Sequence, residues 1–389
     1  MMTSLPSPRA RIYHQSLWAR YKGQIFSRMH AVGERNGLNT AFIHVAETSE
    51  NRMTLGGVDR SYHQYPYEVL FPGAYENVSS LKLAVRLISD LLKHPSELVV
   101  LPGYHLPEHW VMLIVCMLLR RKRAVWVDST TYDRKKSRFK EAAKRFFFLR
   151  CDGFFCYGIR SKEYVASYGV DERKIFYRCQ AAALPPGYDA SVVRRYYRER
   201  PPSTSGAPRF LYIGRLSAEK GLYDLIDAFA ATRKKMPEAR LDIVGSGHFE
   251  REVRERCQSA GVNSAVDFLG PKTAEEIGQL LMRSDALVLP SHSEPWGLVV
   301  NEALSYGCPV VVSDICGCVP ELVIEASTGF SYPCGDVPAL TAAMLSVAEM
   351  VAERAAVATR CLEVIEQYTT DNAALEILGG CVRIIKTPE

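Results

Sequence analysis

Short apolar runs alternate with longer amphipathic stretches along most of the 389-residue chain. The runs at 97–101, 124–127, 209–213 and 286–290 have the length of buried strands, and the stretches between them follow the period of a helix. Such alternation predicts parallel sheets with helical crossovers, and therefore an α/β fold. No regular element is predicted over 46–77, which is rich in Gly, Tyr and Pro.

The alternation is interrupted again between residues 185 and 208, where Pro, Gly and Ser accumulate. This composition breaks regular structure and is typical of a linker. The length suits two domains better than one. We predict an N-terminal domain over residues 1–185, a linker over 186–207 and a C-terminal domain over 208–368. A closing helix over 369–389 is predicted to cross back to the first domain.

Composition narrows the class of protein. A hydrophobic content of 47% and a charged content of 23% are those of a globular chain. The 11 cysteines lack a Cys-x-x-Cys pair, which favours packing cysteines in a reducing compartment. The N-terminus has no apolar core of a signal peptide, and no run reaches the ~18 apolar residues of a membrane span. We therefore expect a cytoplasmic protein.

Charge is distributed unevenly. Residues 1–185 carry 28 Lys and Arg against 16 Asp and Glu, whereas residues 186–389 carry 20 against 27. This asymmetry predicts that the first half meets an anionic surface or substrate.

Residues 291–322 predict a loop, a helix and a strand in succession. Gly307 stands where a helix C-cap glycine belongs. Two carboxylates, Glu294 and Glu302, lie on either side of the predicted helix start after Gly297. Open α/β sheets bind ligands at the carboxyl ends of their strands, and a helix N-terminus attracts anions. Because Gly297 has no side chain, a bulky anion can approach the backbone there.

Glu294 and Glu302, with seven residues between them, resemble the E-x7-E signature of retaining GT-B glycosyltransferases, in particular the large family 4 group. The sequence Pro-Trp-Gly-Leu at 295–298 matches the usual context. The resemblance implies two Rossmann-like domains facing each other across a cleft that holds the active site. It also implies that Glu302 accepts hydrogen bonds from the donor's ribose hydroxyls and that Glu294 faces the sugar or its leaving side.

A second motif, Gly-Arg-Leu-Ser-Ala-Glu-Lys-Gly at 214–221, resembles the family's G-R-L-x-x-x-K-G segment. Negative charge grows on a departing nucleoside diphosphate. Arg215 can hold phosphate oxygens in bidentate fashion, and Lys220 can supply a point charge. In isolation these residues are more typical of a solvated surface; the downstream glutamates favour function. The chain has no Asp-x-Asp, so we expect transfer without a metal ion or other cofactor.

The Val-Gly-Ser-Gly loop that contains Gly245 and Gly247 is similar to the start of the G-x-G-x-x-G fingerprint of dinucleotide-binding proteins. Glu250 stands where that fingerprint needs its third glycine, so NAD binding is not expected. The resemblance places this loop beside the donor's base and phosphates. The donor-binding residues predicted in the second domain are Gly214, Arg215, Lys220, Gly245, Gly247, Gly270, Pro271, Ser291, Glu294, Trp296, Gly297, Leu298, Val299 and Glu302.

The first domain resembles the family less closely. Where many members have a Gly-Gly loop after the first strand, this chain has Tyr21, Lys22 and Gly23, which we predict to bind the acceptor. Where many have a histidine after the strand at 124–127, Asp128 stands here. Asp128 is predicted to orient the sugar or acceptor; His105 either shares that role or caps a turn. The catalytic residues predicted are Glu294, Arg215, Lys220, Asp128 and His105.

Basic and aromatic residues are interleaved over 134–150. This pattern suits an anionic membrane face or a lipid-diphosphate acceptor, but also a solvated helix with core phenylalanines. No nucleic-acid motif accompanies it, so a nucleic-acid partner is not expected.

Together these features predict a retaining, metal-independent glycosyltransferase that uses a UDP- or GDP-sugar. The preferred acceptor is a lipid-linked cell-envelope or exopolysaccharide glycan precursor, with the enzyme peripheral on the cytoplasmic face of the inner membrane. One alternative is a soluble glycosyltransferase that makes a small glycoside or storage sugar. Another is a nucleotide-sugar-binding protein without catalysis.

Overall fold

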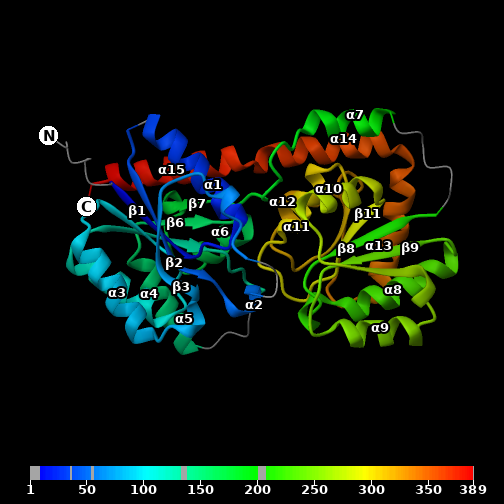
Figure 1. Cartoon of the computed structure of the whole chain (residues 1–389), viewed down its shortest axis with the longest axis horizontal. Helices are drawn as coiled ribbons and strands as arrows, with labels where there is room; N and C mark the ends of the chain where they lie inside the picture. Colours follow the sequence, from blue (N-terminus) through cyan, green and yellow to red (C-terminus); the bar gives the residue numbers. More distant parts are fainter. Residues whose placement is uncertain (1–8, 36, 54–56, 133–137, 200–206, 389) are drawn as a thin grey trace. The chain divides into compact units, whose positions relative to one another are not determined.

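The chain is described by a computed structural model that covers residues 9–35, 37–53, 57–132, 138–199 and 207–388. It divides into two compact units (Figure 1). Unit 1 comprises residues 1–183 and 370–389, and unit 2 comprises residues 184–369.

Unit 1 is built on a seven-stranded sheet in the order β3-β2-β1-β4-β5-β6-β7, and all its strand pairs are parallel. The strands are β1 Ala10–Ser16, β2 Thr40–Thr48, β3 Tyr67–Ala74, β4 Leu98–Leu101, β5 Lys122–Val127, β6 Gly153–Cys156 and β7 Ile175–Phe176. The helices are α1 Arg20–Arg35, α2 Glu50–Met53, α3 Ser80–Lys93, α4 Pro107–Leu118, α5 Arg138–Leu149, α6 Ile159–Ala166 and α15 Thr370–Lys386.

Helices cover both faces of this sheet. Apolar residues of α3, α4, α5 and α6 form one core with the strands, and those of α1 and α15 form another. The terminal helix α15 packs closely: a side chain added at Gly380 would meet the rings of Phe155 and Phe176.

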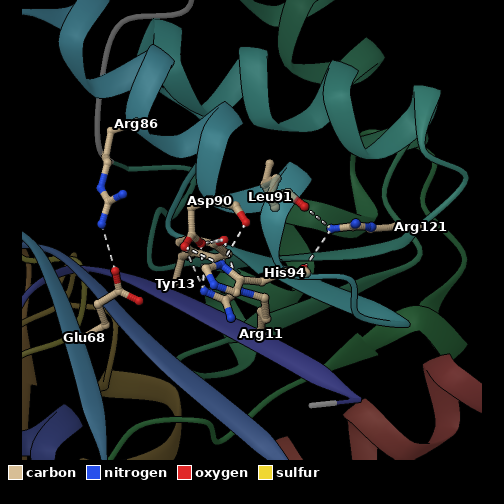
Figure 2. A network of polar contacts seen from close by, with 8 residues as sticks. All are labelled: Arg11, Tyr13, Glu68, Arg86, Asp90, Leu91, His94 and Arg121. Atoms are coloured by element: carbon tan, nitrogen blue, oxygen red, sulfur yellow. Dashed lines mark hydrogen bonds and ion pairs between the residues drawn. The ribbon is translucent and has the colours of Figure 1, made fainter. Parts of the chain in front are cut away.

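A buried polar network fastens α3 to β1 in unit 1 (Figure 2). The Arg11 guanidinium donates to Asp90 at 2.8 Å, and the Tyr13 hydroxyl donates to the same carboxylate. The His94 ring contacts the other carboxylate oxygen at 3.0 Å. Because Arg11 and Asp90 are both buried, each depends on the other to offset its loss of hydration. This pair therefore fixes the position of α3 on the sheet.

Unit 2 has a six-stranded parallel sheet in the order β10-β9-β8-β11-β12-β13. The strands are β8 Arg209–Ile213, β9 Arg240–Val244, β10 Val266–Gly270, β11 Ala286–Leu289, β12 Val310–Ser313 and β13 Gly329–Tyr332. The helices are α7 Ala190–Glu199, α8 Leu222–Lys235, α9 Glu250–Ser259, α10 Ala274–Arg283, α11 Leu298–Ser305, α12 Val319–Leu322, α13 Val337–Met350 and α14 Arg354–Ile365.

Both sheets have the strand order of Rossmann-type folds, in which the chain reverses direction across the sheet at a switch point. The switch point lies between β1 and β4 in unit 1 and between β8 and β11 in unit 2. The predicted α/β fold with two Rossmann-like domains is therefore confirmed. Among the described helices, none is both long and apolar enough to cross a membrane.

Candidate functional site

The loops after β8 and β9 in unit 2 lie backbone against backbone. Gly245 has φ 129°, and a side chain added there would come within 1.9 Å of the Gly214 carbonyl oxygen. At Gly247 the same addition would come within 2.1 Å of the Leu216 carbonyl oxygen. These glycines are needed because no side chain fits between the loops. They bring the ends of the two strands together at the carboxyl edge of the sheet.

A second glycine contact joins the loop after β8 to the end of β11. Gly221 has φ 67°, and a side chain there would come within 1.9 Å of the Pro290 carbonyl oxygen. The backbone N–H of His292 donates to the Glu219 carbonyl at 2.8 Å. The two segments that flank the switch point are thereby fixed against each other, which brings Lys220 next to the loop that contains Glu294.

Lys220 and Glu294 form an ion pair. The Lys220 ammonium donates to a carboxylate oxygen of Glu294 at 2.6 Å, and their side chains are 13% and 18% exposed. This partial burial weakens screening by solvent, so the pair interacts more strongly than one on an open surface. Each charge is nevertheless accessible to a ligand at this edge.

Arg215 is held less firmly. Its guanidinium lies 3.3 Å from a carboxylate oxygen of Glu219, and its side chain is 47% exposed. The hydroxyl of buried Tyr212 donates to the Arg215 carbonyl at 2.8 Å, which fixes the backbone while the side chain projects outward. Glu219 has no signal of its own in the sequence, because it occupies a variable position within the motif. The arrangement leaves Arg215 able to exchange Glu219 for an anionic ligand.

The start of α11 is shaped by Gly297, the N-cap residue, which has φ 101°. Just before it, the Trp296 ring is buried and donates to the Asn301 side chain at 2.8 Å. The Gly317 N–H donates to the Glu294 carbonyl at 3.0 Å, and the Cys318 N–H donates to the Trp296 carbonyl at 3.0 Å. These bonds hold the loop rigid, and in the described chain no side chain caps the helix. Its first N–H groups therefore favour an anion.

The remaining predicted donor residues lie along the same edge of unit 2. Glu302 is half-buried on α11, one turn beyond its start. Gly270 ends β10 with φ 67°, and its carbonyl accepts from the Gly245 N–H at 3.0 Å. Ser291 follows β11 and is buried, and its hydroxyl has no hydrogen-bond partner among the described residues. A buried hydroxyl without a partner is unfavourable, which is consistent with a polar group occupying this position in the liganded protein.

Residues 193–360, which contain all of these features, match the model of the glycosyl transferases group 1 family. The matched segment lies within unit 2 and covers less than half of the chain. It is 40% identical over 176 residues to a glycogen synthase of Mycobacterium tuberculosis, covering 45% of this chain and 42% of that protein. It is 32% identical over 175 residues to a D-inositol 3-phosphate glycosyltransferase of Pseudarthrobacter chlorophenolicus, covering 43% and 40%. The chain thus spans less than half the length of the curated relatives it matches.

Solved structures match almost the whole chain. The lipopolysaccharide outer core galactosyltransferase WaaB has a TM-score of 0.73 at 16% identity, covering 96% of this chain and 99% of that one. Anabaena HepE in complex with UDP has a TM-score of 0.69 at 18% identity, covering 95% and 98%. At such low identity the likeness establishes the fold, which is that of GT-B glycosyltransferases.

In unit 1, Tyr21, Lys22 and Gly23 lie in the first turn of α1, just after β1. The Tyr21 hydroxyl lies 3.4 Å from that of Tyr157. A side chain added at Gly23 would meet the His63 ring at 2.8 Å, so α1 lies close to that loop. Their predicted contact with an acceptor stays a prediction.

Lys22 itself is buried. Its ammonium lies 4.1 Å from the centre of the Trp126 ring and 3.4 Å from the Cys179 carbonyl oxygen. Burial lowers the pKa of Lys22 to about 8, and nearby Cys179 and Asp128 partly oppose this shift. Aromatic faces, a carbonyl and a nearby carboxylate together compensate the buried charge.

The other two predicted residues of unit 1 also follow strand ends. Asp128 is exposed after β5, and its carbonyl accepts from the Ser161 hydroxyl at 3.2 Å. His105 is exposed after β4, with its ring 5.5 Å from that of buried His109. These two residues and the start of α1 share the carboxyl edge of one sheet. No described group of three or more His, Cys, Asp or Glu side chains is arranged to hold a metal ion.

Proposed function

We propose that this protein is a retaining glycosyltransferase that moves a sugar from a nucleotide-sugar to an acceptor bound by unit 1, without a metal ion. The observation that carries the proposal is the pair formed by Lys220 and Glu294 beside the exposed cation of Arg215. Cations at a helix start on the carboxyl edge of a parallel sheet suit the diphosphate of such a donor.

The ion pair suggests how the donor is received. In the free protein, Glu294 neutralises Lys220. When a diphosphate binds, Lys220 turns to a phosphate oxygen and Glu294 becomes an acceptor for hydroxyls of the sugar. Arg215 exchanges Glu219 for phosphate in the same way. Both cations then stabilise the charge that grows on the departing diphosphate, the role that preorganised donors play in other enzymes. Transfer follows a same-face route through an oxocarbenium-like state.

The nucleotide is proposed to be UDP, with GDP as the alternative. One solved structure of Anabaena HepE, a protein with the same fold, contains UDP-glucose. The acceptor is proposed to be a lipid-linked cell-envelope or exopolysaccharide glycan precursor. The location is accordingly the cytoplasmic face of the inner membrane.

Helix α5 supports a membrane partner. Three apolar side chains on it project into solvent: Phe139 is 90% exposed, Phe146 48% and Leu149 46%. Exposed Lys140 and Arg145 lie among them. Apolar side chains flanked by cations fit the boundary of an anionic bilayer. Residues 134–137 of the predicted segment lie outside the described residues.

Two other functions compete with this one. The 40% identity to a glycogen synthase favours a soluble enzyme that makes a small glycoside or storage sugar. A nucleotide-sugar-binding protein without catalysis is the other alternative, and the presence of Arg215, Lys220 and Glu302 argues against it.

The test is to incubate the protein with UDP- and GDP-sugars, each with glycogen, small sugars or a lipid-diphosphate glycan, and to follow nucleoside diphosphate release. Release that depends on the lipid-linked acceptor supports the proposal. Release with glycogen or small sugars alone supports the soluble enzyme. Donor binding without release or transfer supports the non-catalytic protein.

A further inference from the structure

A strongly basic pocket lies at the opposite edge of the unit 1 sheet from the predicted acceptor residues. Its volume is about 560 Å³. It lies at the amino ends of β5 and β7, and the helices α4 and α15 end there. Seven cationic side chains and one carboxylate line it: Arg120, Arg121, Lys122, Arg123, Arg173, Lys174, Arg383 and Asp152. We call it the basic pocket.

Three cationic side chains of the basic pocket are held in place by neighbouring groups. The Arg121 guanidinium donates to the Leu91 carbonyl at 2.8 Å and to the His94 carbonyl at 3.3 Å, at the end of α3 (Figure 2). The Lys122 ammonium donates to the Thr387 carbonyl at 2.8 Å. Arg123 lies 3.7 Å from Asp152. These contacts hold the walls of the pocket together without consuming all of its charge.

Three other cations of the pocket are uncommitted. Within the described residues, the side chains of Arg120, Lys174 and Arg383 make no hydrogen bond or ion pair. The Arg383 guanidinium lies 5.5 Å from the centre of the Phe176 ring, and its charge partly opposes the rise that burial causes in the pKa of Glu376. Hydrogen bonds lower the pKa of Asp171 to about 2, and the charge of Lys174 adds to that shift. Gathering like charges is unfavourable unless an anion compensates them. The three side chains are therefore free to bind one.

The backbone at Arg120 closes the end of α4 and directs this residue to the rim of the basic pocket. Arg120 has φ 54°, a conformation that costs a residue other than glycine about 1–2 kcal/mol. The Arg120 N–H donates to the Met117 carbonyl at 3.1 Å and the Arg121 N–H donates to the Cys116 carbonyl at 2.9 Å, so this conformation is the left-handed C-cap that ends α4. The dipoles of α4 and α15 favour cations at their ends, which accounts for part of the placement of Arg120 and Arg383. They do not account for Lys174, which lies in a short turn before β7.

We propose that the basic pocket binds a phosphate-bearing anion, at least as large as a diphosphate. Guanidinium and ammonium groups converging on one cavity provide the donors and the charge that phosphate oxygens require. The phosphate belongs either to a small soluble molecule or to a lipid headgroup. This site is separate from the donor site in unit 2, because it is built from unit 1 residues alone.

The test is titration of the full-length protein with inorganic pyrophosphate by calorimetry. The triple variant R120Q/K174Q/R383Q removes the uncommitted cations. The matched control K234Q/K235Q/R251Q removes the same charge from exposed positions of unit 2. The pocket variant is expected to bind pyrophosphate at least tenfold more weakly than wild type, and the control is expected to bind like wild type. Equal affinity in all three proteins would overturn the proposal.

A second variant guards against misfolding. Arg120→Gly relieves the backbone strain, so it should melt no lower than wild type while it weakens pyrophosphate binding. Co-sedimentation with vesicles of phosphatidic acid, compared with vesicles of phosphatidylcholine, distinguishes a lipid headgroup from a soluble phosphate as the source of the anion. Co-sedimentation lost in the pocket variant alone assigns the site to a lipid headgroup, whereas co-sedimentation equal in both triple variants assigns it to a soluble phosphate. UDP binding, measured in parallel, reports the donor site independently.

Discussion

The ammonium group of Lys220 lies 2.6 Å from a carboxylate oxygen of Glu294, although 74 positions separate them along the chain. They meet because Gly221 lets the loop after β8 pack against the Pro290 carbonyl at the end of β11. The relationship joins two motifs that the sequence presents separately. It places a cation and an anion, each partly accessible, where the sheet reverses its strand order.

Replacing Lys220 with alanine tests the role of the cation. Loss of a preorganised donor to the departing diphosphate should lower turnover by about a hundredfold or more. The fold should survive, because the pair is not fully buried. Turnover is measured as nucleoside diphosphate release, with circular dichroism as the check on folding. Near-normal turnover in a folded variant would exclude Lys220 from the reaction.

Gly221→Ala tests the contact that assembles the site. The new methyl group would collide with the Pro290 carbonyl, and the alanine would have to adopt the φ of 67° that Gly221 has. Gly261→Ala is the matched control, since Gly261 has φ 71° but nothing within 4 Å. The control should lose about 1–2 kcal/mol from its backbone conformation alone. Gly221→Ala should lose about 1–3 kcal/mol more from overpacking. Urea unfolding measures both, and equal losses would show that the contact is dispensable.

Acid should destabilise unit 1 through buried histidines. The His44 and His63 rings both contact the Tyr65 hydroxyl at 2.9 Å. Burial is the main cause that lowers the pKa of His44 to about 3 and that of His63 to about 4. In the unfolded chain they bind protons below pH about 6.5. The unfolded state therefore binds more protons between pH 6.5 and pH 3–4, and stability falls as pH falls through that window.

Each of these two histidines should remove about 1.4 kcal/mol of stability per pH unit within its window. The double variant H44Q/H63Q cannot titrate there and keeps polar groups beside Tyr65. Its melting temperature should fall less between pH 7 and pH 4.5 than that of wild type. Parallel pH profiles for the two proteins would mean that these rings are not the acid-sensitive groups.

The exposed face of α5 is expected to bind anionic membranes. The variant F139S/F146S removes two apolar side chains of α5 that project into solvent. The control variant I324S/L375S removes two apolar side chains outside α5 that are also about half exposed. The α5 variant should co-sediment less with phosphatidylglycerol vesicles, while the control should match wild type and donor turnover should be unchanged. Loss of binding in both variants, or in neither, would argue against α5 as the membrane contact.

The strongly periodic parts of the fold could be predicted from the sequence, and one weakly periodic part could not. Strand β8 was predicted at the residues it occupies, because an unbroken apolar run admits little else. Strand β3 was missed. It contains Pro72 and Gly73, it lies at the edge of the sheet, and only two of its eight residues are buried. Its pairing with β2 depends on tertiary contacts that local pattern does not record.

For the candidate site, too, some features could be predicted from the sequence and others could not. The two motifs indicated Lys220 and Glu294 separately. That the two side chains form an ion pair could not be predicted from either motif, because the pair depends on the contact between Gly221 and the Pro290 carbonyl. The burial of Lys22 beneath Trp126 was likewise unpredictable, because the two residues meet only when α1 crosses the sheet. Glycines 245 and 247 were predicted to lie beside the donor, and that stays a prediction; the structure shows that they pack loop against loop.

The most direct test of the central claim is a thermal-shift comparison of UDP, GDP and NAD on wild type and Lys220→Ala. A ligand at a hundred times its dissociation constant adds about 2.7 kcal/mol of stability, which corresponds to a shift of a few degrees. UDP or GDP should raise the melting temperature of wild type, the shift should shrink in Lys220→Ala, and NAD should have no effect. A shift with NAD alone, or an equal UDP shift in both proteins, would contradict the central claim.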